Sequence, residues 1–182
     1  DVIALRCRRM VVFTADRVVA ERPKLNAVRP CVLELLAHGI GRVAIRRHRG
    51  GFQIPLLSTA SGAAYLAFCE PDKRNELIEF ALAEDKGALS RCGTNLDLYK
   101  RSLETVRTDG YSCMRVIEAN HNALAFPILV NGEVFATLSA RFYTTAMTLQ
   151  QAAERYADDL REATKRMGVD IAAWKAQLPD AA

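Results

Sequence analysis

Residues 124–142 read LAFPILVNGEVFATLSARF and contain the clearest structural pattern of the chain. The pair Asn131-Gly132 is the strongest signal for a tight hairpin in the chain, because both residues tolerate the positive backbone angles of a type I′ turn. Apolar and β-branched residues on either side of the pair favour strands. The stretch therefore predicts two antiparallel strands, over 124–130 and 133–142.

A two-residue turn also divides the side chains of the second strand between two faces, since successive side chains alternate. The apolar face is expected in the core: Val134, Ala136, Leu138, Ala140 and Phe142. The other face is mixed: Phe135, Thr137, Ser139 and Arg141. A hydroxyl and a guanidinium two residues apart can clamp a carboxylate, because arginine binds it bidentately. The alternative is that this mixed face meets solvent.

Helices are expected around the hairpin. The first predicted helix covers residues 58–69, the second begins at Pro71, and the third runs from Thr94 to Gly110. A long helix is predicted over 149–167, and a short amphipathic segment follows at 171–178. The first is rich in small residues, so its first turn can approach other backbone or a ligand. Thr148 and Gln151 fit a capping box ahead of the long helix. The segment 86–93 is predicted to be a polar loop.

The pattern before residue 50 predicts strands and one helix. The strands are 2–5, 10–14 and 42–47, and the helix is 27–38, although Pro30 weakens its first turn. Strands, then helices, then a hairpin and a long helix predict an α+β fold, a mostly antiparallel sheet flanked by helices. A chain of 182 residues is expected to form a single domain over 1–182.

Composition narrows the class of protein. Five scattered cysteines without a metal-binding spacing are typical of reduced thiols in the cytosol. The sequence has no apolar run of membrane-spanning length and no signal-peptide pattern. A net charge of +4 with short basic runs is typical of a solvated surface. We therefore expect a cytoplasmic protein with no metal, no cofactor and no membrane contact.

Catalytic motifs are absent from the sequence: it has no nucleophile elbow, phosphate-binding glycine loop, HExxH or dinucleotide fingerprint. A Cys/His pair such as Cys113 with His121 is a candidate for an activated thiolate. A small cysteine-dependent enzyme stays open as an alternative, but we expect no catalytic residue and no enzyme.

Four segments occur in an order that is specific when they are taken together: IPLLSTASGAAYLAF (54–68), VRTDGYS (106–112), LAFPI (124–128) and VFATLS (134–139). They resemble the effector-binding domain of IclR-family transcription regulators, over about residues 50–168. The stretch TAMT (145–148), with the residues that follow it, further resembles the branch that regulates catabolism of hydroxyphenylpropionate-like aromatic acids.

The resemblance implies a sensor domain of GAF- or profilin-like fold. Such a domain binds a small organic acid, aromatic or 2-oxo, and thereby modulates DNA binding by a winged-helix domain ahead of residue 1. The resemblance also implies a homodimer or tetramer that contacts DNA only through that other domain. An oligomerisation module without a working ligand site is the alternative from a different class.

The resemblance also implies an effector site. Its main residues are Ile54, Ala60, Ser61, Ser139 and Arg141. The further candidates are Val43 and Arg46, either Cys113 or Met114, and Ala123. Simple alternation places Ala123 on the opposite face from Ser139, unless Pro127 marks a bulge. The expected mechanism is that Arg141 and the N–H groups at the start of the helix near Ala60 hold the acid.

Overall fold

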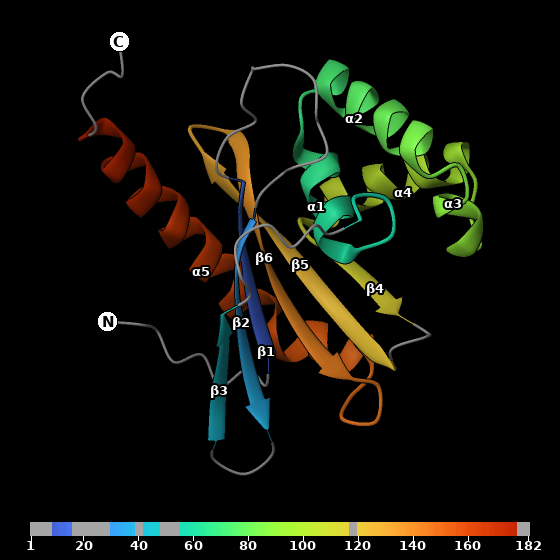
Figure 1. Cartoon of the computed structure of the whole chain (residues 1–182). Helices are drawn as coiled ribbons and strands as arrows, with labels where there is room; N and C mark the ends of the chain where they lie inside the picture. Colours follow the sequence, from blue (N-terminus) through green and yellow to red (C-terminus); the bar gives the residue numbers. More distant parts are fainter. Residues whose placement is uncertain (1–8, 16–29, 39–41, 48–54, 117–119, 178–182) are drawn as a thin grey trace.

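The computed structural model describes residues 9–15, 30–38, 42–47, 55–116 and 120–177. They form an α+β fold, in which a helix covers one face of a sheet and further helices cover the other face (Figure 1). The strands are β1 (Arg9–Ala15), β2 (Pro30–His38), β3 (Arg42–Arg47), β4 (Ser112–Val116), β5 (His121–Val130) and β6 (Glu133–Tyr143). The helices are α1 (Ala60–Phe68), α2 (Pro71–Glu84), α3 (Ala88–Arg91), α4 (Leu96–Asp109) and α5 (Leu149–Ala176).

The six strands lie in the order β3-β2-β1-β6-β5-β4, and every neighbouring pair is antiparallel. This arrangement confirms the predicted α+β class. The strands predicted at 10–14 and 42–47 are confirmed as β1 and β3, while the strand predicted at 2–5 lies outside the described residues.

The helix predicted over 27–38 is wrong, because residues 30–38 form strand β2. Two neighbours, β1 and β3, pair with this segment along its length and so satisfy its backbone groups. That long-range pairing overrides the helical spacing of the leucines. Pro30 stands at the first position of the strand, where a missing N–H is tolerated.

The predicted hairpin is confirmed by its backbone angles. Asn131 has φ 53° and Gly132 has φ 87°, as a type I′ turn requires. The turn therefore follows from local chemistry alone.

Replacing Gly132 with alanine is expected to lower the free energy of unfolding by about 1 kcal/mol, because an L side chain is strained at a left-handed backbone angle. Nothing lies within 4 Å of the added Cβ, so the effect is conformational and not steric. Urea denaturation followed by circular dichroism measures it. Glu133→Ala, at the exposed neighbouring position, is the control and is expected to change little. Unchanged stability of Gly132→Ala would mean that the turn readily adopts another type.

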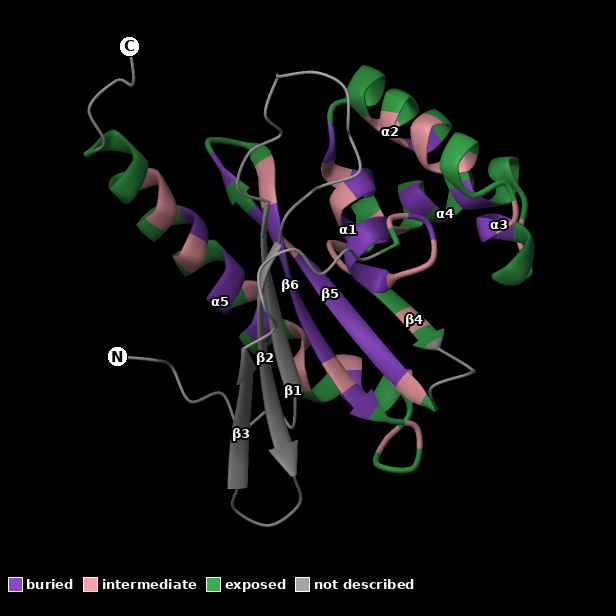
Figure 2. Cartoon of the chain, viewed as in Figure 1, coloured by how far each residue is buried: buried purple, intermediate pink, exposed green. Residues whose placement is uncertain are grey.

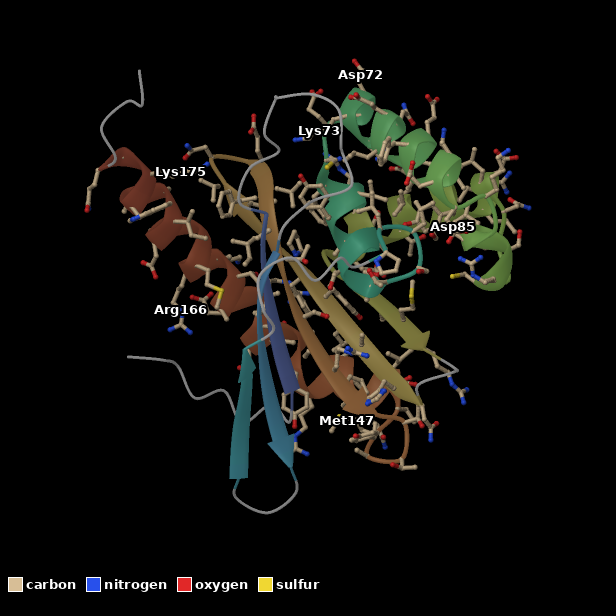
Figure 3. The ribbon with its side chains drawn as sticks, in the orientation of Figure 1. Asp72, Lys73, Asp85, Met147, Arg166 and Lys175 are labelled. Carbon is tan, nitrogen blue, oxygen red and sulfur yellow. The ribbon has the colours of Figure 1, made fainter. Side chains whose placement is uncertain are left out.

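A β-bulge interrupts the β5–β6 ladder. The register shifts between Ile128 and Leu129, which leaves Phe135 of β6 without an opposite residue. Phe135 consequently packs against the core on the α5 side, and the Nζ atom of Lys175 lies 4.6 Å from the centre of its ring (Figure 3 labels Lys175). The prediction that Phe135 shares a face with Ser139 is therefore wrong, because one extra residue reverses the alternation.

Helix α5 covers β5 and forms the larger core with the sheet. The predicted capping box is present at Thr148 and Gln151. The predicted helix end before Gly168 is wrong, because α5 continues to Ala176. Gly168 is instead a point of close packing, since a Cβ there would lie 2.2 Å from the carbonyl oxygen of Leu129. Glycine lets the helix approach the strand this closely.

Helix α1 lies between the sheet and the other helices. It contacts β4, β5 and β6 on one side and α4 on the other. Figure 2 shows that buried residues run through β5, β6 and α1. The loop predicted at 86–93 contains the single turn α3, because Ala88 and Leu89 are buried in the cluster formed by α1, α2 and α4.

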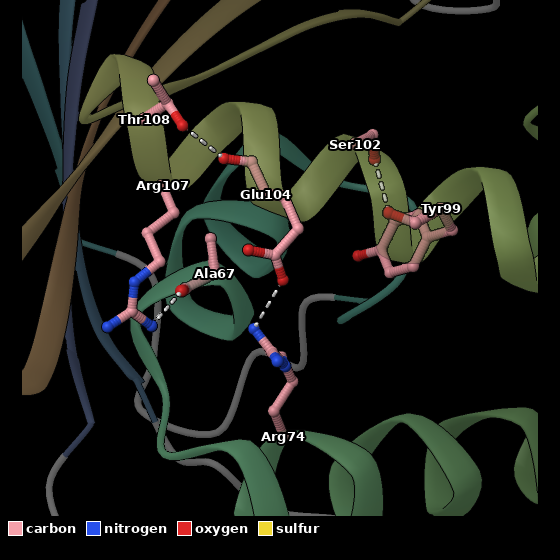
Figure 4. Close-up of polar contacts among 7 residues, drawn as sticks. All are labelled: Ala67, Arg74, Tyr99, Ser102, Glu104, Arg107 and Thr108. Carbon is pink, nitrogen blue, oxygen red and sulfur yellow. Dashed lines mark hydrogen bonds and ion pairs between the residues drawn. The ribbon is translucent and has the colours of Figure 1, made fainter.

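Polar contacts tie α1 and α2 to α4 (Figure 4). The Arg107 guanidinium donates to the carbonyl oxygen of Ala67 in the last turn of α1, at 3.3 Å. Arg74 of α2 pairs with Glu104 of α4 at 3.4 Å. A cation at the carboxyl end of α1 also complements its helix dipole. Helices α1, α2 and α4 are thus linked by side chains as well as by their apolar cluster.

Candidate functional site

Some of the predicted effector residues lie together where α1 crosses the sheet. Ala60 and Ala64 of α1 are buried against Ala123 and Ala125 of β5, with Met114 of β4 beside them. All four alanines are at most 6% exposed. Their short side chains let the start of α1 come close to the strands, as the small-residue run predicts.

The bulge brings Ala123 to this face. Without the extra Phe135, Ala123 would lie opposite Ala140, whose side chain belongs to the α5 core. With it, Ala123 lies opposite Arg141 and shares its face. The shift occurs between residues 128 and 129, one position beyond the expected Pro127. Pro127 itself is accommodated because the β4 register ends before it.

Thr59 fixes the start of α1. Its Oγ1 accepts from the N–H of Gly62 at 3.1 Å and donates to the carbonyl oxygen of Pro55 at 2.9 Å. The first helical hydrogen bond is made by Ala63, so the N–H groups of Ala60 and Ser61 have no partner within the helix. Ser61 is 8% exposed, so this first turn is buried beside the sheet.

Ser139 and Arg141 occupy alternate positions of β6 on the α1 side of the sheet. Ser139 is 2% exposed, and its Oγ donates to the carbonyl oxygen of Leu124 at 3.2 Å. Arg141 is half-buried, and its guanidinium makes no hydrogen bond or ion pair with another residue in the described ranges. The hydroxyl of Thr137 precedes them on the same strand face and is buried. The mixed face therefore does not simply meet solvent.

Arg46 lies in the same cross-strand row as Ser139. The backbone register pairs Ser139 with Val11, Val11 with Glu34, and Glu34 with Arg46. Three strand spacings separate the two ends of the row, a distance of about 14 Å between backbones. The backbone of Arg46 is therefore at the far end of this row. Ile54 lies outside the described residues.

Cys113 is not brought to this face. It pairs with Leu124, whose side chain belongs to the α5 core, so alternation leaves Met114 on the α1 side. Of the two candidates at this position, the structure groups Met114 with Ala60 and Ala64.

The predicted pair of Cys113 with His121 is not formed. His121 pairs with Val116, three positions along the strand from Cys113 and on the other face. Desolvation raises the pKa of the Cys113 thiol, and the charge of Asp109 raises it further. The surroundings thus favour the neutral thiol over the thiolate that a nucleophile needs.

Two aromatic residues extend the α1-side face beyond Arg141. His121 and Tyr143 lie opposite each other, with ring centroids 4.5 Å apart. The sequence pattern does not place His121 on this face, because the strand predicted over 124–130 begins three residues later than β5 does. Alternation from Arg141 would have placed Tyr143 on this face.

A shallow hollow of about 480 Å³ lies elsewhere, at the start of α5. It is lined by Ala146, Met147, Gln151, Glu154 and Arg155, of which Figure 3 labels Met147. Met147 packs against the core on the α5 side of the sheet. The hollow therefore gathers none of the predicted effector residues.

Within the described ranges, no group of three or more histidine, cysteine or acidic side chains could hold a metal ion. Over the same ranges, no helix combines the length and the apolar character needed to cross a bilayer.

No family model matches the sequence, but solved structures match the fold. A transcriptional regulator of Rhodococcus sp. RHA1 has 20% identity and a TM-score of 0.65, with 91% of this chain and 63% of that chain covered. An IclR homolog of Microbacterium hydrocarbonoxydans, complexed with 4-hydroxybenzoate, has 24% identity and a TM-score of 0.63, with 92% and 62% covered. The inducer-binding domain of PobR from Acinetobacter, a double mutant with 3-hydroxybenzoic acid, has 16% identity and a TM-score of 0.59, with 88% and 87% covered.

The aligned share of each chain shows which part of those proteins is similar to this one. This chain spans less than two thirds of the first two regulators and most of the isolated inducer-binding domain. Its fold is therefore similar to that of the PobR inducer-binding domain and to that of the corresponding part of the IclR homolog.

Proposed function

We propose that this chain is the effector-sensing domain of a bacterial regulator of the IclR family. It binds a small organic acid, aromatic or 2-oxo, and so modulates DNA binding by a winged-helix domain that belongs to the same protein. The working unit is a cytoplasmic homodimer or tetramer, and DNA is contacted through the winged-helix domain alone.

The observation that carries this proposal is the half-buried guanidinium of Arg141, which has no partner among the described residues. It stands on a face whose other members near α1 are alanines and Met114. The guanidinium can supply a bidentate partner for a carboxylate, and the small apolar side chains beside it are compatible with an aromatic or aliphatic ligand.

The start of α1 offers a second group of donors for an acid. The N–H groups of Ala60 and Ser61 lack helical partners, and the helix dipole favours negative charge at this end. A carboxylate between α1 and Arg141 would therefore be held from both sides. Binding and not turnover is the proposed activity.

A route from the ligand to the rest of the domain runs through α1. Movement of α1 would pass to α4 through the Arg107 contact with Ala67, and then to α2 through Arg74 and Glu104 (Figure 4). The ligand alters regulation only as far as it binds one arrangement of these elements better than another.

Replacing Arg141 with alanine is expected to weaken binding of an aromatic acid about 10- to 100-fold, because a charge-assisted hydrogen bond contributes about 1.5–3 kcal/mol. Isothermal calorimetry of the purified domain with 4-hydroxybenzoate measures the affinity. Arg115→Ala is the matched control, since Arg115 is exposed on the other face of the same sheet and should leave the affinity unchanged.

Two outcomes would count against this assignment. Equal affinity of Arg141→Ala and the parent protein would remove Arg141 from the site. Absence of thermal stabilisation by any acid in a broad panel, with a stable dimer, would favour an oligomerisation module instead.

A further inference from the structure

The hydroxyl of Tyr99, near the start of α4, is buried without a hydrogen-bond partner. Tyr99 is 5% exposed, and among the described residues its hydroxyl neither donates nor accepts a hydrogen bond. The Ser102 hydroxyl, drawn beside it in Figure 4, donates instead to the backbone carbonyl of Tyr99, at 2.7 Å. A buried hydroxyl left unpaired destabilises the conformation that buries it.

The surroundings of this hydroxyl do not replace the hydration that it has lost. Tyr99 belongs to the cluster of apolar side chains that joins α1, α2, α3 and α4. A buried water needs several polar partners, which apolar side chains do not supply. Burial accordingly raises the pKa of the Tyr99 phenol. Any conformation that returns water to the hydroxyl therefore gains free energy relative to this packing.

The end of α3 lies near the Tyr99 hydroxyl. Cys92 follows α3 directly, and its charge also raises the pKa of Tyr99, so the thiol and the phenol are close in space. Ala88 and Leu89 of α3 are 6% and 5% exposed, whereas residues 90–93 are exposed. Helix α3 therefore covers this end of the cluster with two apolar side chains, on the side of the domain away from the sheet (Figure 1).

The backbone hydrogen bonds of residues 86–94, here called the α3 segment, are local. Within the described ranges, they join residues of the segment to one another or to Asp85. Asp85 also pairs with Arg91 and accepts from the N–H of Gly87 at 3.2 Å, both at the exposed surface. Moving the segment off the cluster therefore breaks no backbone bond to another element.

We propose that the α3 segment is a flap that opens locally, and that hydration of the Tyr99 hydroxyl in the open state favours its opening. Burial of Ala88 and Leu89 closes the flap. The open state loses these two apolar contacts and gains one hydrated polar group, so the two effects oppose each other. Local opening of this kind requires less free energy than global unfolding. The flap is independent of the acid-sensing function proposed above.

Amide hydrogen exchange, followed by NMR on the purified protein, tests the flap. A single helical turn is unstable by itself, so the amides of residues 91–94 exchange once the segment is open. The amides of Leu160 and Ala163, on the buried stripe of α5, report global unfolding. In the parent protein we expect residues 91–94 to exchange at least about 100-fold faster than these two, after correction for intrinsic rates.

Tyr99→Phe removes the unpaired hydroxyl and keeps the ring. We expect it to slow exchange of residues 91–94 about tenfold, because the open state no longer gains a hydrated group. The amide of Ala146, which donates to Tyr143 in a separate turn, should exchange at its parent rate. A slowing at residues 91–94 without a slowing at Ala146 assigns the effect to the flap.

Two further variants complete the test. Tyr156→Phe is the matched control, because Tyr156 of α5 is half-buried and its hydroxyl is not among the buried unpartnered atoms of the described residues. It should leave exchange of residues 91–94 unchanged. Leu89→Ala removes the larger closing side chain and should speed that exchange at least about tenfold.

Two results would overturn the inference. If residues 91–94 exchange as slowly as Leu160 and Ala163 in the parent protein, the segment opens only with the whole domain and is not a flap. If Tyr99→Phe leaves their exchange unchanged, or if Tyr156→Phe slows it equally, the Tyr99 hydroxyl does not favour opening. Neither result bears on acid binding, which calorimetry measures separately.

Discussion

Gly62→Ala is expected to lower the free energy of unfolding by about 3 kcal/mol or more, although alanine ordinarily stabilises a helix by about 1 kcal/mol over glycine. A Cβ at this position would lie 1.9 Å from the carbonyl oxygen of Leu56 and 2.6 Å from its carbonyl carbon. Both atoms are backbone, so α1 or the preceding segment must shift. The Gly62 N–H bond to Thr59 would shift with it.

Urea denaturation followed by circular dichroism measures the loss. Asn75→Ala in α2 is the control, because this exposed helix position gains helix propensity without meeting other backbone. It should be neutral or slightly stabilising. A Gly62→Ala variant as stable as the parent would show that the segment ahead of α1 can move away at little cost. The close approach would then not be needed to hold the start of α1 beside the sheet.

Phe126→Ala is expected to destabilise the domain by about 3–5 kcal/mol, since it removes a large side chain from a closely packed core. The Phe126 side chain is fully buried on the α5 face of β5. Its ring also stacks on Tyr111, with centroids 5.1 Å apart and an angle of 14° between the rings. The cavity and the lost ring contact both act in the same direction.

Phe126→Leu is the matched variant, because it keeps an apolar side chain and leaves a smaller cavity. Its loss should be clearly smaller than that of alanine when both are compared by thermal and urea unfolding. Equal, small losses in both variants would mean that α5 can close onto the vacated space. The helix would then be less firmly held on β5 than its packing indicates.

Phe126 and Gly62 lie on opposite sides of the sheet. Their variants can therefore distinguish an effect on folding stability from an effect on ligand binding. Phe126 belongs to the core under α5, while Gly62 belongs to the helix that lies over Ser139 and Arg141. A variant in the core should lower stability and leave the ligand preference of the folded protein unchanged. A variant at the start of α1 should affect both, because α1 supplies part of the proposed site.

Local chemistry made several elements predictable from the sequence. Asn131-Gly132 specifies the turn because few other residues adopt its backbone angles, and Thr148 with Gln151 specifies the start of α5 through the capping box. The alternation of Ser139 and Arg141 on one strand face is also local. Such features depend on residues within a few positions of one another, so tertiary context does not change them.

The features that were predicted wrongly depend on contacts with segments far away in the sequence. Strand β2 forms because β1 and β3 flank it, and Gly168 continues a helix because a distant strand packs against it. The single extra residue Phe135 moves Ala123 to the face of Arg141 and leaves Cys113 on the other. The sequence alone was enough to place α1, α2, α4 and the start of α5, the hairpin and the polar residues of its last strand. The tertiary structure decided which neighbours share their face, because strand register and close packing are properties of pairs of segments and not of either segment alone.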